Sequence, residues 1–183
     1  VLGASLAARL GGPLLIHTDD SAAIEETAAA LSSEALVLGV DEAPPPLSGS
    51  STAIDGVDAT LDWLVAHTID VPYLTVSNTN DRLSGRSQKA SMVAPLYAAN
   101  REGLSLPIQL EMPTTVIDDG GVHPVLPMLD AAYERLGTPP EYLAIVGAHD
   151  ALPQMRKPTI FDNPLNEQPV SDLPYGQIDA DAF

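Results

Sequence analysis

The chain contains no cysteine, which excludes disulfides, thiolate zinc ligands and a thiol nucleophile among its 183 residues. It is also poor in positive charge, with 8 lysines and arginines against 25 aspartates and glutamates. The net charge of −17 argues against a nucleic-acid partner, because phosphates would be repelled and no basic stripe attracts them. The sequence has no run of about 20 apolar residues, so we expect no transmembrane segment.

Short apolar runs alternate with helical patterns along the sequence. Hydrophobic residues make up 45% and charged residues 18%, which is typical of a globular domain. The expected strands cover residues 13–17, 35–40, 72–77, 106–111 and 142–146. The expected helices cover residues 2–10, 21–32, 54–68, 89–101 and 125–136. This alternation predicts an α/β fold with a parallel sheet flanked by helices, a three-layer arrangement like that of flavodoxin or the caspases, with a small N-terminal αβαβ unit.

Composition divides the chain into three parts. Residues 41–51 read DEAPPPLSGSS, and three successive prolines cannot continue a helix or a central strand. We therefore expect an N-terminal αβαβ unit over 1–43, a linker over 44–52, and an α/β domain with a proline-rich C-terminal segment over 53–183. Because the chain starts inside a helical pattern without an initiator methionine, we expect a fragment, a processed product or one subunit of a larger protein.

The C-terminal part of the sequence carries a family resemblance. An apolar run ends at Val146 and Gly147, His149 and then Leu152-Pro153 follow, and the segment SDLPYGQI begins at Ser171. This pattern resembles the gingipain-type cysteine peptidases, in which a strand ending in Val-Gly-Asp-His leads to Ile-Pro and then to Ser-Asp-x-x-Tyr-Gly-x-Ile. The resemblance implies the first, non-catalytic half of such a peptidase module. The family's catalytic histidine and cysteine come later, and this chain has no cysteine.

The N-terminal part resembles one repeat of the cell-wall-binding type 2 family. That repeat has a small-residue helix, a Gly-x-Pro-Leu-Leu run, a second helix and a strand ending in glycine. The matching positions are Leu6–Leu10, Gly12–Leu15 and Leu36–Gly39, while Val40 stands where the family typically has a second glycine. Family members use these repeats, usually in threes, to hold proteins at a cell surface. Both resemblances imply an extracellular or cell-surface location.

His149 and Asp150 are the candidate ligand-binding residues. They follow an expected strand end, where α/β folds place ligands, and a histidine beside a carboxylate can act as a general base. No serine, cysteine or lysine nucleophile can be assigned beside them, so we assign no catalytic residue. Packing within the loop is the alternative role. The polar segment 78–87 is a second candidate, for a carboxylate or a glycan, with a turn-rich connector as its alternative.

Calcium is the one cofactor that the sequence suggests. Asp172, Asp179 and Asp181 could bind it with backbone oxygens, although they do not match the twelve-residue EF-hand loop. A solvated acidic tail is the alternative. The four histidines show no H-x-x-x-H spacing, which argues against a histidine-based zinc site.

Three functions remain open from the sequence, and the weakest of them is an α/β subunit of a larger complex that binds a small ligand at strand ends. The leading one is a non-enzymatic extracellular or cell-surface domain that acts by binding or assembly with other protein chains or with the continuation of the same polypeptide. The proline-rich segment 153–174 either wraps the domain or lies across such a partner. The alternative is the non-catalytic half of a gingipain-like cysteine peptidase whose catalytic His and Cys lie outside this chain.

Overall fold

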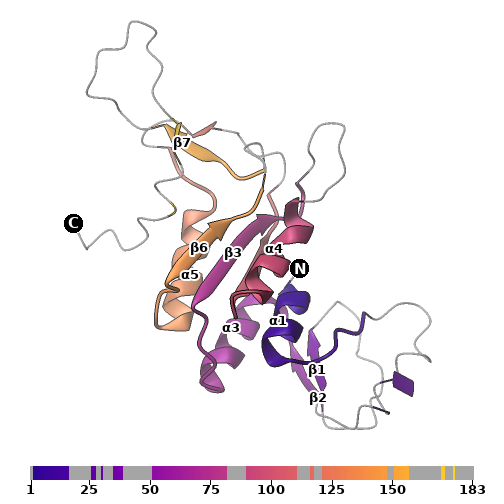
Figure 1. Cartoon of the computed structure of the whole chain (residues 1–183). Coiled ribbons are helices and arrows are strands. Elements are labelled where there is room, and N and C mark those ends of the chain that lie inside the picture. The colour runs from indigo at the N-terminus through magenta and orange to yellow at the C-terminus, as the bar shows by residue number, and fades with distance from the viewer. Residues whose placement is uncertain are drawn as a thin grey trace, which may run out of the picture.

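The structure is a computed structural model of the chain (Figure 1). It describes residues 2–16, 26–27, 30, 35–38, 51–81, 90–110, 116–117, 121–147, 151–156, 170–171 and 175. The helices are α1 (Leu2–Leu10), α3 (Gly56–Ala66), α4 (Ala90–Ala99) and α5 (Leu126–Leu136). The strands are β1 (Ala35–Leu38), β2 (Ser51–Ile54), β3 (Tyr73–Asn78), β4 (Leu104–Ile108), β5 (Val116–Ile117), β6 (Tyr142–Ile145), β7 (Gln154–Arg156) and β8 (Val170–Ser171).

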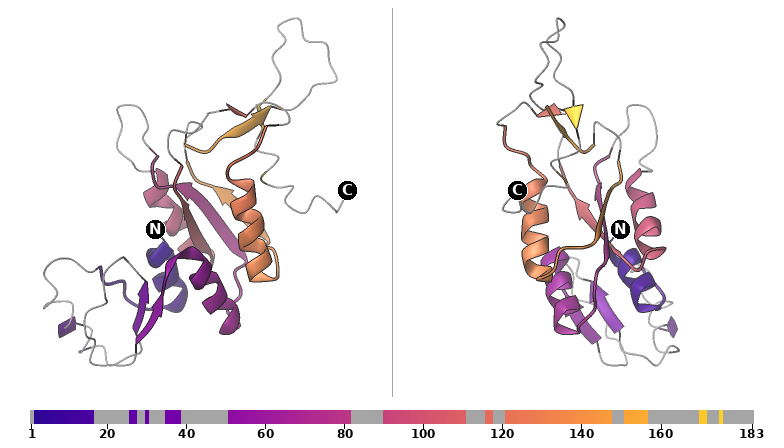
Figure 2. Two further views of the ribbon diagram at one scale, coloured as in Figure 1. Left: turned by 180° about the vertical axis from the view of Figure 1, so that it is seen from behind. Right: turned by 60° about the vertical axis from the view of Figure 1, so that its left-hand side comes forward.

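A three-stranded parallel sheet forms the centre of the molecule. Its strand order is β4-β3-β6, and Leu74 of β3 lies opposite both Leu104 of β4 and Leu143 of β6. Helices α1 and α4 lie on one side of this sheet, and α3 and α5 lie on the other (Figure 2). The expected α/β fold, a parallel sheet between helical layers, is therefore confirmed.

The middle strand shows why a parallel sheet forms here. Every residue of β3 from Leu74 to Asn78 is buried, because helices cover both faces of the strand. A strand covered on both sides favours a continuous run of apolar and small residues over strict alternation, as in the sequence YLTVSN. The core residues that surround β3 come from both helical layers and from β4: Leu6, Leu61, Leu64, Leu104, Leu106 and Leu129.

Strand β4 is one edge of the sheet, and α1 protects that edge. The N–H of Thr79 donates to the carbonyl of Ile108 at 2.8 Å, so the backbone groups of Ile108 face β3 while those of Ser105 and Pro107 face outward. The outward N–H of Ser105 donates to Ser5 Oγ of α1 at 3.0 Å, and Pro107 has no N–H. Neither outward position therefore offers a donor to another strand, which limits edge-to-edge association.

The turn from α4 into β4 requires glycine at position 103. A Cβ atom on Gly103 would run into the carbonyl group of Tyr73. The N–H of Gly103 also donates to the carbonyl of Ala98 at 2.8 Å and so closes the helix. The preceding residue, Glu102, has a left-handed φ of 55°. This tight turn brings β4 directly alongside β3.

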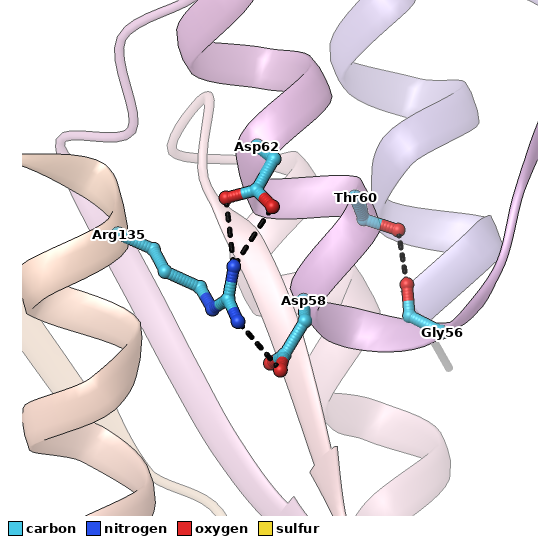
Figure 3. A network of polar contacts seen from close by, with 5 residues as sticks. All are labelled: Gly56, Asp58, Thr60, Asp62 and Arg135. Atoms are coloured by element: carbon cyan, nitrogen blue, oxygen red, sulfur yellow. Dashed lines mark hydrogen bonds and ion pairs between the residues drawn. The ribbon is translucent and has the colours of Figure 1, made fainter.

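On the opposite face of the sheet, Arg135 of α5 is paired with α3 (Figure 3). Its Nη1 contacts the two carboxylate oxygens of Asp62 at 2.8 and 2.9 Å, and its Nη2 donates to Asp58 at 3.0 Å. The hydrogen bond to Asp62, followed by the charges of both carboxylates, raises the pKa of Arg135. Because these groups are exposed, the pairs orient the two helices more than they stabilise the fold.

Residues 13–16 and the two smaller sheets differ from the sequence-based expectations. No strand forms at residues 13–16, which have no strand partner among the described residues and whose Leu14, Leu15 and Ile16 side chains are exposed. Strand β2 pairs in parallel with β1 and occupies residues 51–54, where the sequence predicts the end of a linker and the start of a helix. The third sheet, β5-β7-β8, lies beyond the carboxyl ends of the central strands (Figure 1). The division into domains at residues 43 and 53 stays a prediction.

Candidate functional site

The carboxyl edge of the central sheet is the usual ligand position in this type of fold. The connection after β3 runs to α4 on one face, whereas the connection after β4 runs to α5 on the other (Figure 2). Adjacent strands whose connections leave to opposite faces form a topological switch point, where a crevice opens between the strand ends. Asn78, which ends β3, and the residues up to Asp81 lie at this point.

The side-chain amide of Asn78, the last residue of β3, makes four hydrogen bonds at this point. Its Nδ2 donates to the carbonyls of Ala151 at 2.9 Å and Leu110 at 3.4 Å. Its Oδ1 accepts from the N–H groups of Asn80 at 2.9 Å and Leu110 at 3.2 Å. The amide thus uses its full hydrogen-bonding capacity. It joins the loops that follow all three central strands and has no donor or acceptor left for a ligand.

The residues after Asn78 serve the same structural purpose. Thr79 donates through its N–H and its Oγ1 to the carbonyl of Ile108, at 2.8 and 3.1 Å. Asn80 Nδ2 donates to the carbonyl of Leu110 at 3.4 Å. Asp81 is buried, which the polar sequence around it does not predict, and its N–H donates to the carbonyl of Asn78 at 3.1 Å. Residues 78–81 therefore fasten the sheet edge, while residues 82–87 of the expected binding segment lie outside the described residues.

His123 joins the loop before α5 to the segment after β6. Its Nδ1 lies 3.2 Å from the backbone nitrogen of Val125, and its Nε2 lies 3.1 Å from the carbonyl oxygen of Pro153. Because Nδ1 must accept the Val125 N–H, the proton resides on Nε2 and the ring is neutral. Burial lowers the pKa of His123, and the hydrogen bond to Pro153 partly opposes that shift.

Tyr175 completes this joint. Its hydroxyl donates to the same Pro153 carbonyl at 2.8 Å, and its ring stands edge-on to His123 with the ring centres 4.8 Å apart. Both rings are buried. In the sequence, His123 is only a histidine before a proline in a glycine-rich loop. Its structural role depends on contacts with Pro153 and Tyr175, which lie 30 and 52 positions later in the chain, and it could therefore not be predicted locally.

The ligand and calcium residues expected from the sequence lie outside the described residues. These are His149, Asp150, Asp172, Asp179 and Asp181. Their proposed roles stay predictions. Within the described part of the chain, no group of three or more histidine, aspartate or glutamate side chains is placed to hold a metal ion. In the same part, no helix combines the length and apolar character needed to cross a bilayer.

The outer side of α4 exposes four large hydrophobic side chains. Met92 is 67% exposed, Val93 37%, Leu96 62% and Tyr97 54%. With about 3.6 residues per turn, these four positions fall within about 140° of the helix circumference. We call this surface the α4 outer face. It is a contiguous apolar strip along most of the length of the helix.

The inner side of α4 is apolar as well. Ala94 and Ala98 are fully buried against the sheet, and Thr75 of β3 donates its hydroxyl to the carbonyl of Ala94 at 3.3 Å. None of the ten residues of α4 is charged. A helix that is apolar on all sides is typical of a buried position. The composition of α4 therefore fits an environment in which its outer side is also covered.

Compared with known proteins, the chain matches no family model, no curated protein and no solved structure.

Proposed function

We propose that this chain is a non-enzymatic domain of the cell exterior that docks another protein surface through the α4 outer face. The docked surface belongs to another protein chain or to the continuation of the same polypeptide. The observation that carries the proposal is the exposure of Met92, Val93, Leu96 and Tyr97 on one side of an uncharged helix. Contiguous exposed apolar patches on soluble proteins typically mark interaction sites.

The residue types of the α4 outer face also suit the centre of a protein interface. Aromatic residues and methionine are enriched in the buried part of interfaces, and charged residues are depleted there. Tyr97 and Met92 belong to the enriched types, and α4 has no charge that would need to be desolvated. Because a standard interface covers about 800 Å² per partner, the four side chains would form its centre, with neighbouring polar residues as the rim.

The carboxyl edge supports the non-enzymatic part of the proposal. Among the described residues near that edge, Asn78 and His123 direct their polar atoms into hydrogen bonds with the backbone. The chain also lacks a thiol nucleophile, since it has no cysteine. The location at the cell exterior rests on the two family resemblances in the sequence.

The peptidase-related alternative differs in the identity of the partner. In that case the docked surface would be the catalytic half of a gingipain-like peptidase, which would have to supply the cysteine that this chain lacks. This alternative stays a prediction.

A photoreactive amino acid at position 96 tests the docking proposal in the cells that produce the protein. We expect a discrete crosslinked product from position 96, because its side chain would face the partner. The matched control is position 130, where Asp130 is exposed on α5 in the opposite helical layer, and there we expect none. Crosslinking of equal yield from both positions, or none from position 96, would contradict the proposal.

A peptidase assay tests the non-enzymatic part separately. We expect the purified chain to leave peptides containing arginine or lysine uncut. Cleavage that disappears in a His149→Ala variant would show that the chain is an enzyme.

A further inference from the structure

Strand β6 is the second edge of the central sheet, opposite the β4 edge. The N–H groups of Tyr142 and Val146 donate to carbonyls of the neighbouring segment 72–76, at 3.1 and 2.8 Å. Because the backbone groups of a parallel strand point alternately to its two sides, the N–H and carbonyl groups of Leu143 and Ile145 point away from β3. Among the described residues, no backbone group pairs with this outer side of β6.

The two edges of the sheet differ in their protection. On β4, the outward N–H of Ser105 is bonded to α1, and Pro107 has no N–H. Strand β6 reads YLAI and contains neither a proline nor a charged residue, the usual devices that prevent an edge from pairing with another strand. The β6 edge is therefore competent to accept a further strand, whereas the β4 edge is not.

One face of β6 is uncovered as well. Thr75 of β3 bonds to α4, and Ala144 and Tyr142 lie opposite Thr75 and Tyr73, so all four side chains are on the α4 side of the sheet. In that layer α4 packs on β3 and β4, and α1 packs on β4, while β6 lies on the side of β3 away from α4 (Figure 1). Tyr142 is accordingly 59% exposed. Parallel strands are normally covered on both faces, so this part of the sheet is incomplete in the isolated chain.

The uncovered face of β6 is continuous with the α4 outer face. The ring centre of Tyr73 lies 6.2 Å from that of Tyr142 and 5.5 Å from the guanidinium carbon of Arg101. Tyr97 of the α4 outer face precedes Arg101 by four positions, which is about one helical turn. One partner can therefore cover both surfaces at once.

We infer that a separate protein chain adds an extended strand to β6 while it covers the α4 outer face. This inference rests on the docking function proposed above and specifies how the partner binds. The backbone of the added strand would pair with Leu143 and Ile145, and its alternate side chains would lie beside Tyr142 and Ala144. The net charge of −17 favours a strand without acidic residues.

Two other occupants of the β6 edge are less suitable. Two copies of the chain would each bring a net charge of −17 and would repel each other. A parallel strand supplied by the chain directly after β6 would need a crossover of about a dozen residues or more. Strand β7 instead begins nine positions after β6 ends, and it belongs to another sheet. A separate chain without excess negative charge meets neither difficulty.

Amide exchange in the isolated chain tests whether the β6 edge is open. The amides of Leu143 and Ile145 should exchange at least about tenfold faster than those of Tyr142 and Val146, which are bonded within the sheet. The comparison is made within one strand and needs no substitution. Equally slow exchange of all four amides would show that the edge is already paired within the chain and would overturn the inference.

A photoreactive amino acid at position 144 tests the added strand in the cells that produce the protein. We expect a crosslinked product that contains the same protein captured from position 96. Leu143→Pro should lower the yield from position 144 about fivefold, the effect of losing one hydrogen bond. Leu143→Ala is the matched control, because it removes the same side chain but keeps the N–H, and its yield should equal that of the parent chain.

Each other outcome overturns the inference in a recognisable way. A product from position 96 without one from position 144 would remove the added strand but keep docking through α4. No product from either position would contradict the docking function itself. Equal yields from the proline and alanine variants would show a contact without backbone pairing. A product made of two copies of this chain would assign the edge to a second copy, and a crosslink within one polypeptide would assign it to the chain's own continuation.

Discussion

The two helical layers of this molecule bury similar inner sides but present different outer sides. Helices α3 and α5 carry charged residues along their exposed surfaces, with an arginine paired to two aspartates between them, and their exposed large hydrophobic residues are single ones, Val65 and Met128. Helix α4 has no charged residue and exposes four large hydrophobic side chains in one strip. Both layers cover the same sheet, so folding alone does not require the difference.

The comparison separates what the fold needs from what a partner needs. Folding requires small or apolar residues on the inner sides, such as Ala94 and Ala98 on α4 and Leu61 and Leu64 on α3. The outer sides are free to be polar, as on α3 and α5. An apolar outer side on α4 exposes hydrophobic area to water, and that cost is recovered only when another surface covers it.

The inner and outer sides should respond very differently to truncation. Leu64→Ala on the inner side of α3 should lower the free energy of unfolding by about 2–5 kcal/mol, because it leaves a cavity in the core. Leu96→Ala on the α4 outer face should change it by no more than about 0.5 kcal/mol. Urea unfolding measures both. A large loss from Leu96→Ala would mean that this side chain belongs to the core of the isolated chain, and the contrast between the layers would fail.

Substitution of Asn78, which joins the loops after the three central strands, should have the next largest effect on the free energy of unfolding. Asn78→Ala removes four hydrogen bonds and leaves buried backbone groups of the three loops without their partner, so we expect a loss of about 2–3 kcal/mol. Asn80→Ala is the matched control, since its side chain makes one long hydrogen bond of 3.4 Å. Equal effects of the two substitutions in urea unfolding would show that Asn78 does not hold the loops together.

The free energy of unfolding should also depend on pH through His123, which lies in the loop before α5. Burial lowers its folded-state pKa below the unfolded value of 6.5, so the unfolded chain binds more protons in this range. The contribution of His123 to stability should therefore be complete above about pH 6.5 and should be lost as the pH falls through the folded-state pKa. Relative to the parent chain, a His123→Gln variant should lose this dependence between pH 7.5 and 5.5.

His67 provides the control for that measurement. It is an exposed histidine on the C-terminal side of α3, stacked on Trp63 with ring centres 4.1 Å apart. His67→Gln should leave the free energy of unfolding at pH 7.5 within about 0.5 kcal/mol of the parent value, which controls for the replacement of a histidine by glutamine. A His123→Gln variant with an unchanged pH dependence would mean that protonation of His123 does not disturb its contacts with Val125 and Pro153.

The smallest effect should come from the ion pairs of the charged layer. Arg135→Ala removes the contacts with Asp58 and Asp62, but all three groups are exposed and screened by water. The melting temperature in dilute buffer should fall only slightly, and the difference from the parent chain should disappear in 1 M NaCl. A large loss that persists at high salt would show that Arg135 packs as part of the core.

The sequence predicts the central part of the fold because the signals there are local. The apolar runs of β3 and β6, and the apolar patterns of α3 and α5 with Gly137 at the end of α5, each lie within one short window of sequence. The pairing of β2 with β1 could not be predicted, since it depends on a partner strand outside that window and overrides the helical pattern that begins at Ile54. The burial of Asp81 is likewise not indicated by the polar residues around it in the sequence.

For a related reason, the sequence predicts the candidate site only in part. The polar run after β3 is visible in the sequence, but whether Asn78 binds a ligand or the backbone depends on the positions of Leu110 and Ala151. The helix at α4 is also visible, yet an apolar helix reads as buried until the structure shows that no described element covers Leu96 and Tyr97. Exposure is a property of the packed molecule and has no local signature.

Methionine oxidation compares the two layers within one molecule and tests the central claim most directly. Met92 on α4 is 67% exposed and Met128 on α5 is 45% exposed, so hydroxyl radicals should oxidise both in the isolated chain. In the intact protein at its native location, we predict that Met92 becomes protected while Met128 reacts as before. Equal oxidation of Met92 in the isolated chain and in the intact protein would show that nothing covers the α4 outer face, and it would contradict the account.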